Sequence, residues 1–511
     1  MINLLLTFLF ILLLDLSEQR ASGEMIADSK RMIFFHRYML TNIVQVHNDM
    51  NRNEDLIFLQ IFGAESYNMR LIEHDDQLMI DMAVKFNAYY FNVEHRYFGT
   101  SFPNNSMSTE NLRRFLTVEQ MIEDIEVFIK TMDQKNPFRN PKWVIFGGGY
   151  AGTVISLFNK IHPDSVIGTV ASSAPLHFEL DFSDYSRVIE FVMNVTTRPT
   201  AIASCSLFGR LTIETIVNRT KSAEGMAELS NTLHISPPLT MTSPQENIDF
   251  FLSNVFEMFQ GMTENSRIGT SKETQNELTV RKMCDLLSTD QSFLNNLWMT
   301  YLWYKEHKGE MTPNHFPTDY QEMLNNYKET NTSMMFDDQV NTRGWMFLRC
   351  NGLGFFPRTD THSIFKDIVQ LKYYFKLCND LFGMDETSVR KSNEDFIKKY
   401  ETDNREFSNI VFSNGLYDPW NGLVYSKEDG KKNVKTVTIS AGAHSSDLYP
   451  KYEGEPEDLP VARQQIAQFL QIIIDQGTTI RPIESTTKFS TSFSEVQGMI
   501  VVCVFAILML L

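Results

Sequence analysis

Basic residues are scarce in this chain relative to acidic ones. Its 511 residues include 46 Lys and Arg against 63 Asp and Glu, which gives a net charge of −17. No cluster of Lys and Arg occurs, and binding to a phosphate backbone needs one, so we expect no nucleic-acid partner. Histidines and carboxylates never take a metal-ligand spacing such as H-E-x-x-H. We therefore predict no metal and no cofactor.

Internal repeats and low-complexity linkers are also absent before residue 477. Their absence excludes a repeat array, in which each short unit packs only on its neighbours. Hydrophobic residues make up 43% of the chain and charged residues 21%, a globular composition. A chain of this length exceeds what one hydrophobic core usually fills, so we expect two structural units.

Cysteine is rare, with five in the whole chain. Cys503 lies in an apolar C-terminal stretch, which leaves Cys205, Cys284, Cys350 and Cys378. In an oxidising compartment these four allow three pairings, and their spacing does not choose among them.

Both ends of the sequence carry apolar stretches. Residues 1–16 are mostly apolar, and polar and then small residues follow, so we predict a signal peptide at 1–22, although no Lys or Arg precedes its apolar core. Residues 498–511 are apolar but shorter than the ~20 residues that span a bilayer. Small residues at 485–487 and a polar spacer precede them. For residues 477–511 this order predicts a glycolipid-anchor signal, with a short membrane tail or a C-terminal strand as alternatives.

Strand-like and helix-like segments alternate in the first part of the chain. Thr117 and Gln120 predict a capping box that opens a helix, and strands separated by helices predict a mostly parallel sheet. Helical patterns then dominate until strands return. We expect an α/β core formed by residues 33–182 and 405–476, with a helical cap, residues 183–404, inserted into it. The predicted strands are 56–62, 88–93, 143–146, 166–171, 409–412 and 434–439, and predicted cap helices include 248–262, 279–287 and 361–382.

A glycine-rich turn follows the predicted strand 143–146. The sequence G-G-G-Y-A-G at 147–152 matches the G-x-G-x-x-G dinucleotide fingerprint, but no acidic residue follows the next strand as that fingerprint requires. The alternative is a nucleophile elbow, the G-x-S-x-G turn of α/β-hydrolases. In it Gly149 stands at the serine position and Ala151 in the last place. We favour the elbow.

The partners of such an elbow occur downstream. Asp418 follows the predicted strand 409–412, and His444 follows the predicted strand 434–439. Nucleophile position, then Asp, then His is the order in which α/β-hydrolases place their triad.

Five motifs in this order resemble the family of lysosomal Pro-Xaa carboxypeptidase, dipeptidyl peptidase II and thymus-specific serine peptidase. They are V-E-H-R-Y-F-G at 93–99, I-F-G-G-G-Y-A-G at 145–152, V-A-S-S-A-P at 170–175, F-S-N-G-L-Y-D-P-W at 412–420 and G-A-H at 442–444. The resemblance covers about residues 33–475. It implies an α/β-hydrolase core with a helical cap that shapes a pocket for proline-like residues.

The same resemblance assigns roles to single residues. It puts Asp418 in the charge-orienting position and His444 in the general-base position. Cys350 and Cys378 belong to the cap and are implied to be bonded to each other; Cys205 and Cys284 are a second candidate pair.

The family's nucleophilic serine falls on Gly149, which has no side chain to attack a carbonyl. We therefore predict the fold without the usual peptidase chemistry. The backbone N–H of Tyr150 and one from the loop at 63–65 are expected to remain as oxyanion donors. Ser172 and Ser173 follow a different strand, so we do not expect either to replace the nucleophile.

Other residues point to structure and to the secretory route. His95 and Arg96 leave a strand and are expected to have a structural, salt-bridging role. Acceptor sequences for N-glycosylation begin at four asparagines, which are Asn104, Asn194, Asn218 and Asn331.

Three functional hypotheses follow. The first is a secreted or surface-anchored, non-catalytic homologue of serine exopeptidases that cleave at proline, with peptides, proline-containing ones included, bound in the old cleft. The second is an active dipeptidyl peptidase or prolyl carboxypeptidase that uses an activated water or a displaced serine. The third is a structural surface glycoprotein. The sequence leaves open whether the chain is lysosomal and whether it forms a homodimer.

Overall fold

The computed structural model describes residues 38–40, 55–64, 78–136, 138–197, 203–266, 279–289, 292–308, 315–401, 404–452 and 455–476. The predicted signal peptide, the predicted anchor signal and Cys503 lie outside these residues. Over the described ranges, no helix combines the length and the apolar character that a membrane crossing needs. One compact unit ends at Ile473, and a second begins at Ile474.

A seven-stranded sheet with the order β1-β3-β2-β4-β5-β8-β9 forms the core of the first unit. β1 is antiparallel to β3, and all other neighbours in this sheet are parallel. β8 is buried along its whole length, as expected for a parallel strand covered on both faces. The strands are β1 (Tyr38–Leu40), β2 (Leu56–Ile61), β3 (Tyr89–Val93), β4 (Lys142–Gly148), β5 (Gly168–Ser172), β8 (Ile410–Gly415) and β9 (Val434–Ile439).

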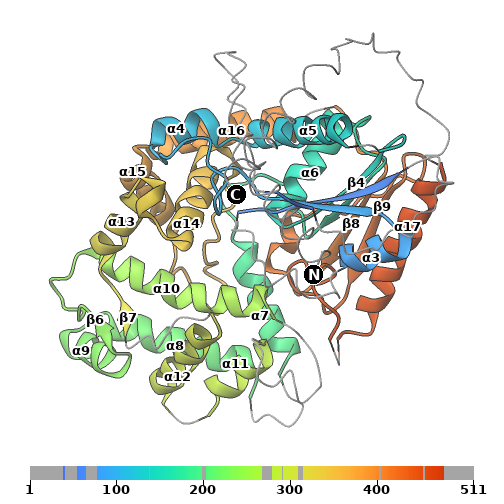
Figure 1. Ribbon diagram of the computed structural model, residues 1–511. Helices are drawn as coiled ribbons and strands as arrows, with labels where there is room; N and C mark the ends of the chain where they lie inside the picture. Colours follow the sequence, from blue (N-terminus) through green and yellow to red (C-terminus); the bar gives the residue numbers. More distant parts are fainter. Residues whose placement is uncertain are drawn as a thin grey trace, which may run out of the picture. The chain divides into compact units, whose positions relative to one another are not determined.

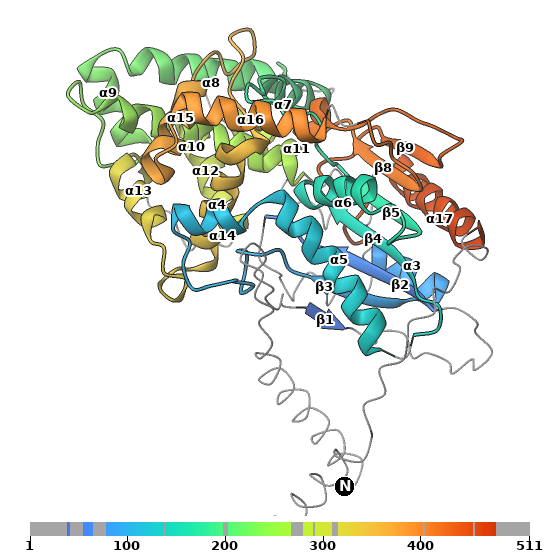
Figure 2. The ribbon, with the colours of Figure 1, turned by 90° about the horizontal axis from the view of Figure 1, so that it is seen from above.

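Helices cover both faces of this sheet. Figures 1 and 2 show α5 and α6 over one face and α3 and α17 over the other. The bounds of these helices are α3 (Leu78–Phe86), α5 (Val118–Lys135), α6 (Tyr150–Ile161) and α17 (Asp458–Gln476), and the short α4 (Thr109–Phe115) precedes α5.

The predicted capping box of α5 forms by half. Thr117 Oγ1 accepts a hydrogen bond from Gln120 N at 3.2 Å. The side chain of Gln120 does not return the bond; its Oε1 accepts from Arg96 Nη1 at 2.9 Å instead. The buried guanidinium of Arg96 therefore uses the side-chain oxygen of Gln120 that a complete capping box would have bonded to the backbone N–H of Thr117.

A block of helices is inserted between β5 and β8, which confirms the predicted α/β-hydrolase core with a helical insertion. Figure 1 shows this block, coloured green to orange, beside the sheet. It also holds the short parallel pair of β6 (Ile235–Ser236) and β7 (Phe316–Pro317). Its helices are α7 (Asp184–Val195), α8 (Cys205–Arg219), α9 (Ala223–Thr232), α10 (Gln245–Glu264), α11 (Val280–Leu287), α12 (Phe293–His307), α13 (Tyr320–Lys328), α14 (Asp337–Leu348), α15 (Leu371–Phe382) and α16 (Glu386–Tyr400).

Two disulfides fasten this block. Cys205 on α8 is bonded to Cys284 on α11, and Cys350, just after α14, is bonded to Cys378 on α15. Of the three pairings that the sequence allows, the structure takes this one.

The predicted helix at 361–382 is wrong in its first half, because α15 begins only at Leu371. Thr359 and Val369 exchange two hydrogen bonds of 3.0 Å, Thr359 N to Val369 O and Val369 N to Thr359 Oγ1. Side chains that bond to nearby backbone compete with helix formation in this way. The segment before Leu371 is therefore a closed turn.

Candidate functional site

The three residues that the motifs single out lie on three loops at one edge of the sheet. Gly149 follows β4, Asp418 follows β8 and His444 follows β9. Because these strands are parallel, their carboxyl ends meet at the same edge, where ligands bind in open α/β sheets.

Gly149 forms the sharp turn between β4 and α6. Its φ is 55° and its ψ is −125°, a region that glycine adopts far more readily than any residue with a Cβ. Its N–H donates to Ser172 O at 2.9 Å, and its carbonyl accepts from Thr153 N at 3.0 Å. The turn therefore has the strained strand-to-helix shape of a nucleophile elbow.

Asp418 and His444 form a hydrogen-bonded pair. His444 Nδ1 lies 3.0 Å from Asp418 Oδ2 and 3.1 Å from Oδ1. Asp418 is only 1% exposed, and its Oδ1 also accepts from Trp420 N at 3.0 Å. A buried, doubly anchored carboxylate fixes the orientation of the imidazole and directs Nε2 away from itself.

The loops of this pair touch at a glycine. A Cβ on Gly415 would lie 2.1 Å from Gly442 O. Tyr417 N donates to the same carbonyl oxygen at 3.0 Å. The close approach of the two loops needs a residue without a side chain at position 415. It brings Asp418 within hydrogen-bonding distance of His444.

The imidazole occupies part of the space that a nucleophile would need. A Cβ built on Gly149 lies 2.6 Å from His444 Nε2 and 3.3 Å from Cε1, whereas ordinary contact begins at 3.4 Å. Gly149 and His444 are therefore closer than a serine at position 149 would allow.

The sequence profile of the family called serine carboxypeptidase S28 matches residues 26–466. The chain belongs to this family. A Caenorhabditis elegans protein named as a serine protease, F56F10.1, is 31% identical over 432 residues, which are 82% of this chain and 79% of that protein. Human lysosomal Pro-X carboxypeptidase is 27% identical over 408 residues, 75% of this chain and 74% of its own. A crystal structure of proline iminopeptidase from Mycobacterium smegmatis aligns with 83% of this chain and 91% of its own at 10% identity and a TM-score of 0.34.

In this S28 family member, motif reasoning missed Glu264, the last residue of α10 in the inserted block. Glu264 O accepts from His444 N at 3.2 Å. Its carboxylate Oε1 accepts from Tyr185 Oη and from Trp420 Nε1. Burial raises the pKa of Glu264, and His444 opposes the rise. Glu264 precedes His444 by 180 residues in the sequence (444 − 264). No local sequence pattern at the end of a helix predicts a contact with a residue so far along the chain.

Two of the residues expected to supply oxyanion donors, Gly63 and Tyr150, lie at the elbow. Tyr150 opens α6 directly after Gly149. Gly63 lies against the same turn, since a Cβ built on it would be 3.2 Å from Ala151 N. Glu65, the third residue of the predicted donor loop, is outside the described residues. Backbone N–H groups at these positions suit a carbonyl or carboxylate oxygen.

The neighbouring serines are held by other partners. Ser172 Oγ donates to the buried carboxylate of Asp447. Ser173 Oγ accepts from Ser445 N at 2.8 Å. Neither contact directs a hydroxyl to His444.

His95 and Arg96 have structural contacts. Arg96 is 1% exposed, and its Nε and Nη2 hold both carboxylate oxygens of Asp124 at 2.6 and 2.5 Å. His95 Nδ1 lies 2.7 Å from Arg96 O, so it is the donor there, and Nε2 accepts from Tyr150 Oη at 3.3 Å. His95 thus positions the side chain of Tyr150 next to the elbow.

Two adjoining cavities lead to the pair. One, of about 400 Å³, is bounded by the elbow, and the other, of about 670 Å³, lies toward the inserted helices. Volumes of this size suit small ligands. The two cavities adjoin beside His444 and share six lining residues: Glu264, Asn265, Trp345, Trp420, His444 and Tyr449.

Proposed function

We propose that this S28 family member is a non-catalytic homologue of the serine peptidases that binds peptides in the old catalytic cleft. The observation that carries the proposal is Gly149 at the apex of the elbow. An Asp–His pair accelerates acyl transfer by taking a proton from an alcohol or thiol, and Gly149 offers neither.

Loss of the nucleophile does not remove the cleft. His444, still bonded to Asp418, borders the smaller cavity together with Gly63 and Tyr150. In subtilisin, removal of the catalytic serine costs about 10⁶ in turnover while binding and the oxyanion hole persist. We therefore expect the cleft still to bind a peptide carbonyl. The name of the human relative, lysosomal Pro-X carboxypeptidase, makes proline-containing peptides the first ligands to test.

The non-catalytic half of the proposal is tested on the native protein with a fluorophosphonate probe. We expect no covalent adduct on any serine, while an S28 member that keeps the serine is labelled in parallel. An adduct on the intact native protein, located by peptide mass spectrometry, would restore the hypothesis of an active peptidase with another nucleophile.

The binding half is tested by calorimetry with acetylated proline-containing peptides. We expect saturable binding that His444→Ala weakens, because the imidazole lines both cavities. Absence of binding at millimolar peptide would leave the third hypothesis, a structural glycoprotein.

We also propose a secretory location with attachment to the cell surface. Two disulfides fit an oxidising compartment. Three of the four acceptor asparagines, Asn194, Asn218 and Asn331, are exposed, whereas Asn104 is half-buried and its Oδ1 accepts from Ser106 N at 3.0 Å. A mature C-terminus near Ser485 that carries glycolipid, found by mass spectrometry, would support the anchor; a chain that keeps residues 498–511 would refute it.

A further inference from the structure

Arg349 lines the wall of the larger cavity at the end of α14. It opens a π-helical turn, Arg349–Leu353, and such turns often occur at functional sites. The next residue, Cys350, is bonded to Cys378 on α15. The backbone that carries Arg349 is therefore fixed from two sides, by a helix and by a disulfide.

Two aromatic rings hold its guanidinium group. The Cζ atom lies 4.9 Å from the ring centre of Phe356 and 5.0 Å from that of Tyr374. These two rings stack on each other at 5.0 Å with 16° between their planes. Cation–π contacts of this kind orient a guanidinium group.

Part of the hydrogen-bonding capacity of Arg349 is unused in the described part of the chain, although its side chain also bonds to that of Tyr374. Its Nε and Nη2 atoms are buried and have no hydrogen-bond partner there. Burial lowers the pKa of this guanidinium, and Tyr374 opposes the fall. The lowered pKa expresses the cost of holding a charge away from water.

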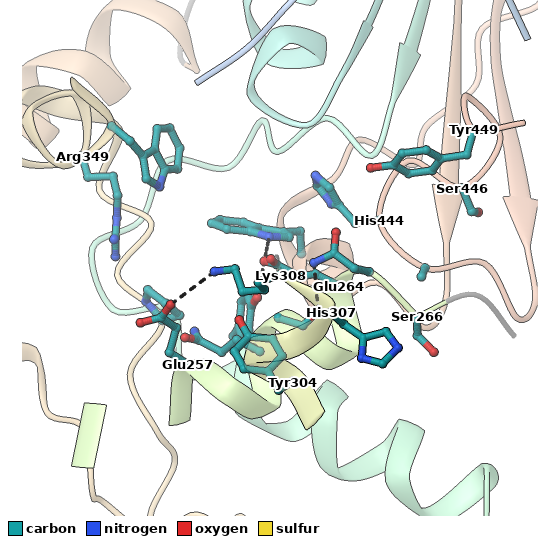
Figure 3. Close-up of a pocket in the computed structure, with 18 of the residues that line it drawn as sticks. Glu257, Glu264, Ser266, Tyr304, His307, Lys308, Arg349, His444, Ser446 and Tyr449 are labelled. Atoms are coloured by element: carbon teal, nitrogen blue, oxygen red, sulfur yellow. Dashed lines mark hydrogen bonds and ion pairs between the residues drawn. The ribbon is translucent and has the colours of Figure 1, made fainter. Parts of the chain in front are cut away.

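The carboxylates near Arg349 have other partners. Glu264, close enough to interact with it electrostatically, accepts from Tyr185 and Trp420. Glu257 lies 3.8 Å from Lys308 Nζ across the cavity wall. Figure 3 shows this ion pair, with Arg349 and His444 at two sides of the same cavity. The wall thus contains a cation whose Nε and Nη2 atoms bond to no carboxylate of the described chain, so a carboxylate partner for them has to come from outside.

We propose that Arg349 is the anion anchor of this cleft and that the ligand bound beside His444 carries a carboxylate. The inference rests on the proposed peptide-binding function and specifies its ligand. A planar guanidinium pairs with a carboxylate through two parallel N–H···O bonds, and the cavity of about 670 Å³ has room for a residue that bears one. The carboxylate can come from a peptide C-terminus or from an acidic side chain.

Calorimetry with four acetylated peptides on the full chain separates these sources. The first pair, acetyl-Ala-Pro-Phe as free acid and as amide, differs only at the C-terminus. The second pair, acetyl-Ala-Pro-Glu amide and acetyl-Ala-Pro-Gln amide, differs only in the side chain. We expect the charged member of one pair to bind about ten- to a hundredfold more tightly than its neutral partner, the range of a charge-assisted hydrogen bond.

Substitutions then locate the effect. Arg349→Met should abolish the preference for the charged peptide, and Arg349→Lys should keep part of it. The matched control is Arg390→Met, since Arg390 is exposed and pairs with Glu386 on α16; it should keep the full preference. Because the preference is measured first in the native protein, the test stands even if Arg349→Met fails to fold.

Three results would overturn the proposal. Equal affinity for both members of each pair would reject the anion anchor and leave peptide binding intact. A preference that survives in folded Arg349→Met would assign it to another residue. Failure of all four peptides to bind would reject this inference together with the peptide-binding function.

Discussion

Replacement of Gly149 by serine places an oxygen at the apex of the elbow. The structure allows the loss of stability that this substitution causes to be estimated. The new Cβ would lie 2.6 Å from His444 Nε2, and ordinary contact begins at 3.4 Å, so the ring has to retreat by 3.4 − 2.6 = 0.8 Å. The side chain of His444 is 25% exposed, which lets it move into the cavity and keep its bond to Asp418.

The backbone contributes a second cost. Gly149 has a φ of 55°, and a residue with a Cβ in this region is disfavoured by about 1–2 kcal/mol. Together with the shift of the ring, we expect Gly149→Ser to lower the free energy of unfolding by about 1–3 kcal/mol. Gly149→Ala adds the same Cβ without the oxygen, so it should lose a similar amount.

The assay compares the two variants. Fluorophosphonate labelling and cleavage after proline are measured for both, with unfolding in urea as the measure of stability. We expect Gly149→Ser to be labelled about a thousandfold faster than Gly149→Ala, a fraction of the roughly 10⁶ that a nucleophile supplies in subtilisin, because its imidazole starts from a displaced position.

Two results would refute this reasoning. Unchanged stability of Gly149→Ala would mean that the close approach of His444 and the strained turn do not exist in solution. Inertness of a well-folded Gly149→Ser would mean that the Asp418–His444 pair no longer activates an alcohol at this distance.

Two further predictions concern buried ionisable groups other than the Asp418–His444 pair. Arg96→Met removes the two hydrogen bonds that Arg96 donates to the carboxylate of Asp124. It should lower the free energy of unfolding, measured in urea, by about 3–5 kcal/mol, whereas the exposed control Arg390→Met should lower it by less than about 0.5 kcal/mol. Equal effects of the two substitutions would contradict a structural role of Arg96. Burial raises the pKa of Asp447, so its contribution to stability is present below about pH 4 and is lost as the pH rises through the folded-state pKa. Asp447→Asn should therefore flatten the stability profile from about pH 4 up through the folded-state pKa, and a profile parallel to that of the native protein would reject the buried titration.

The sequence alone predicted the parts of this fold that depend on local patterns. Strand β9 was expected at the bounds that it has in the structure, Val434–Ile439. Strand-like segments that alternate with helix-like ones predicted the mostly parallel sheet. Where long-range contacts intervene, prediction failed: Arg96 takes the side chain that was to complete the capping box at Thr117, and a loop bonded between Thr359 and Val369 replaces half of a predicted helix.

The linear order of Gly149, Asp418 and His444 predicted which residues would meet, because strand ends of a parallel sheet share one edge. Only the tertiary structure placed Glu264 against His444, put Arg349 on the wall of the cavity that His444 also lines, and brought the imidazole within 2.6 Å of the place of a Cβ on Gly149. The physical reason is that helices inserted between β5 and β8 reach the site through packing across distant parts of the chain, and packing of this kind leaves no periodic signal in the sequence.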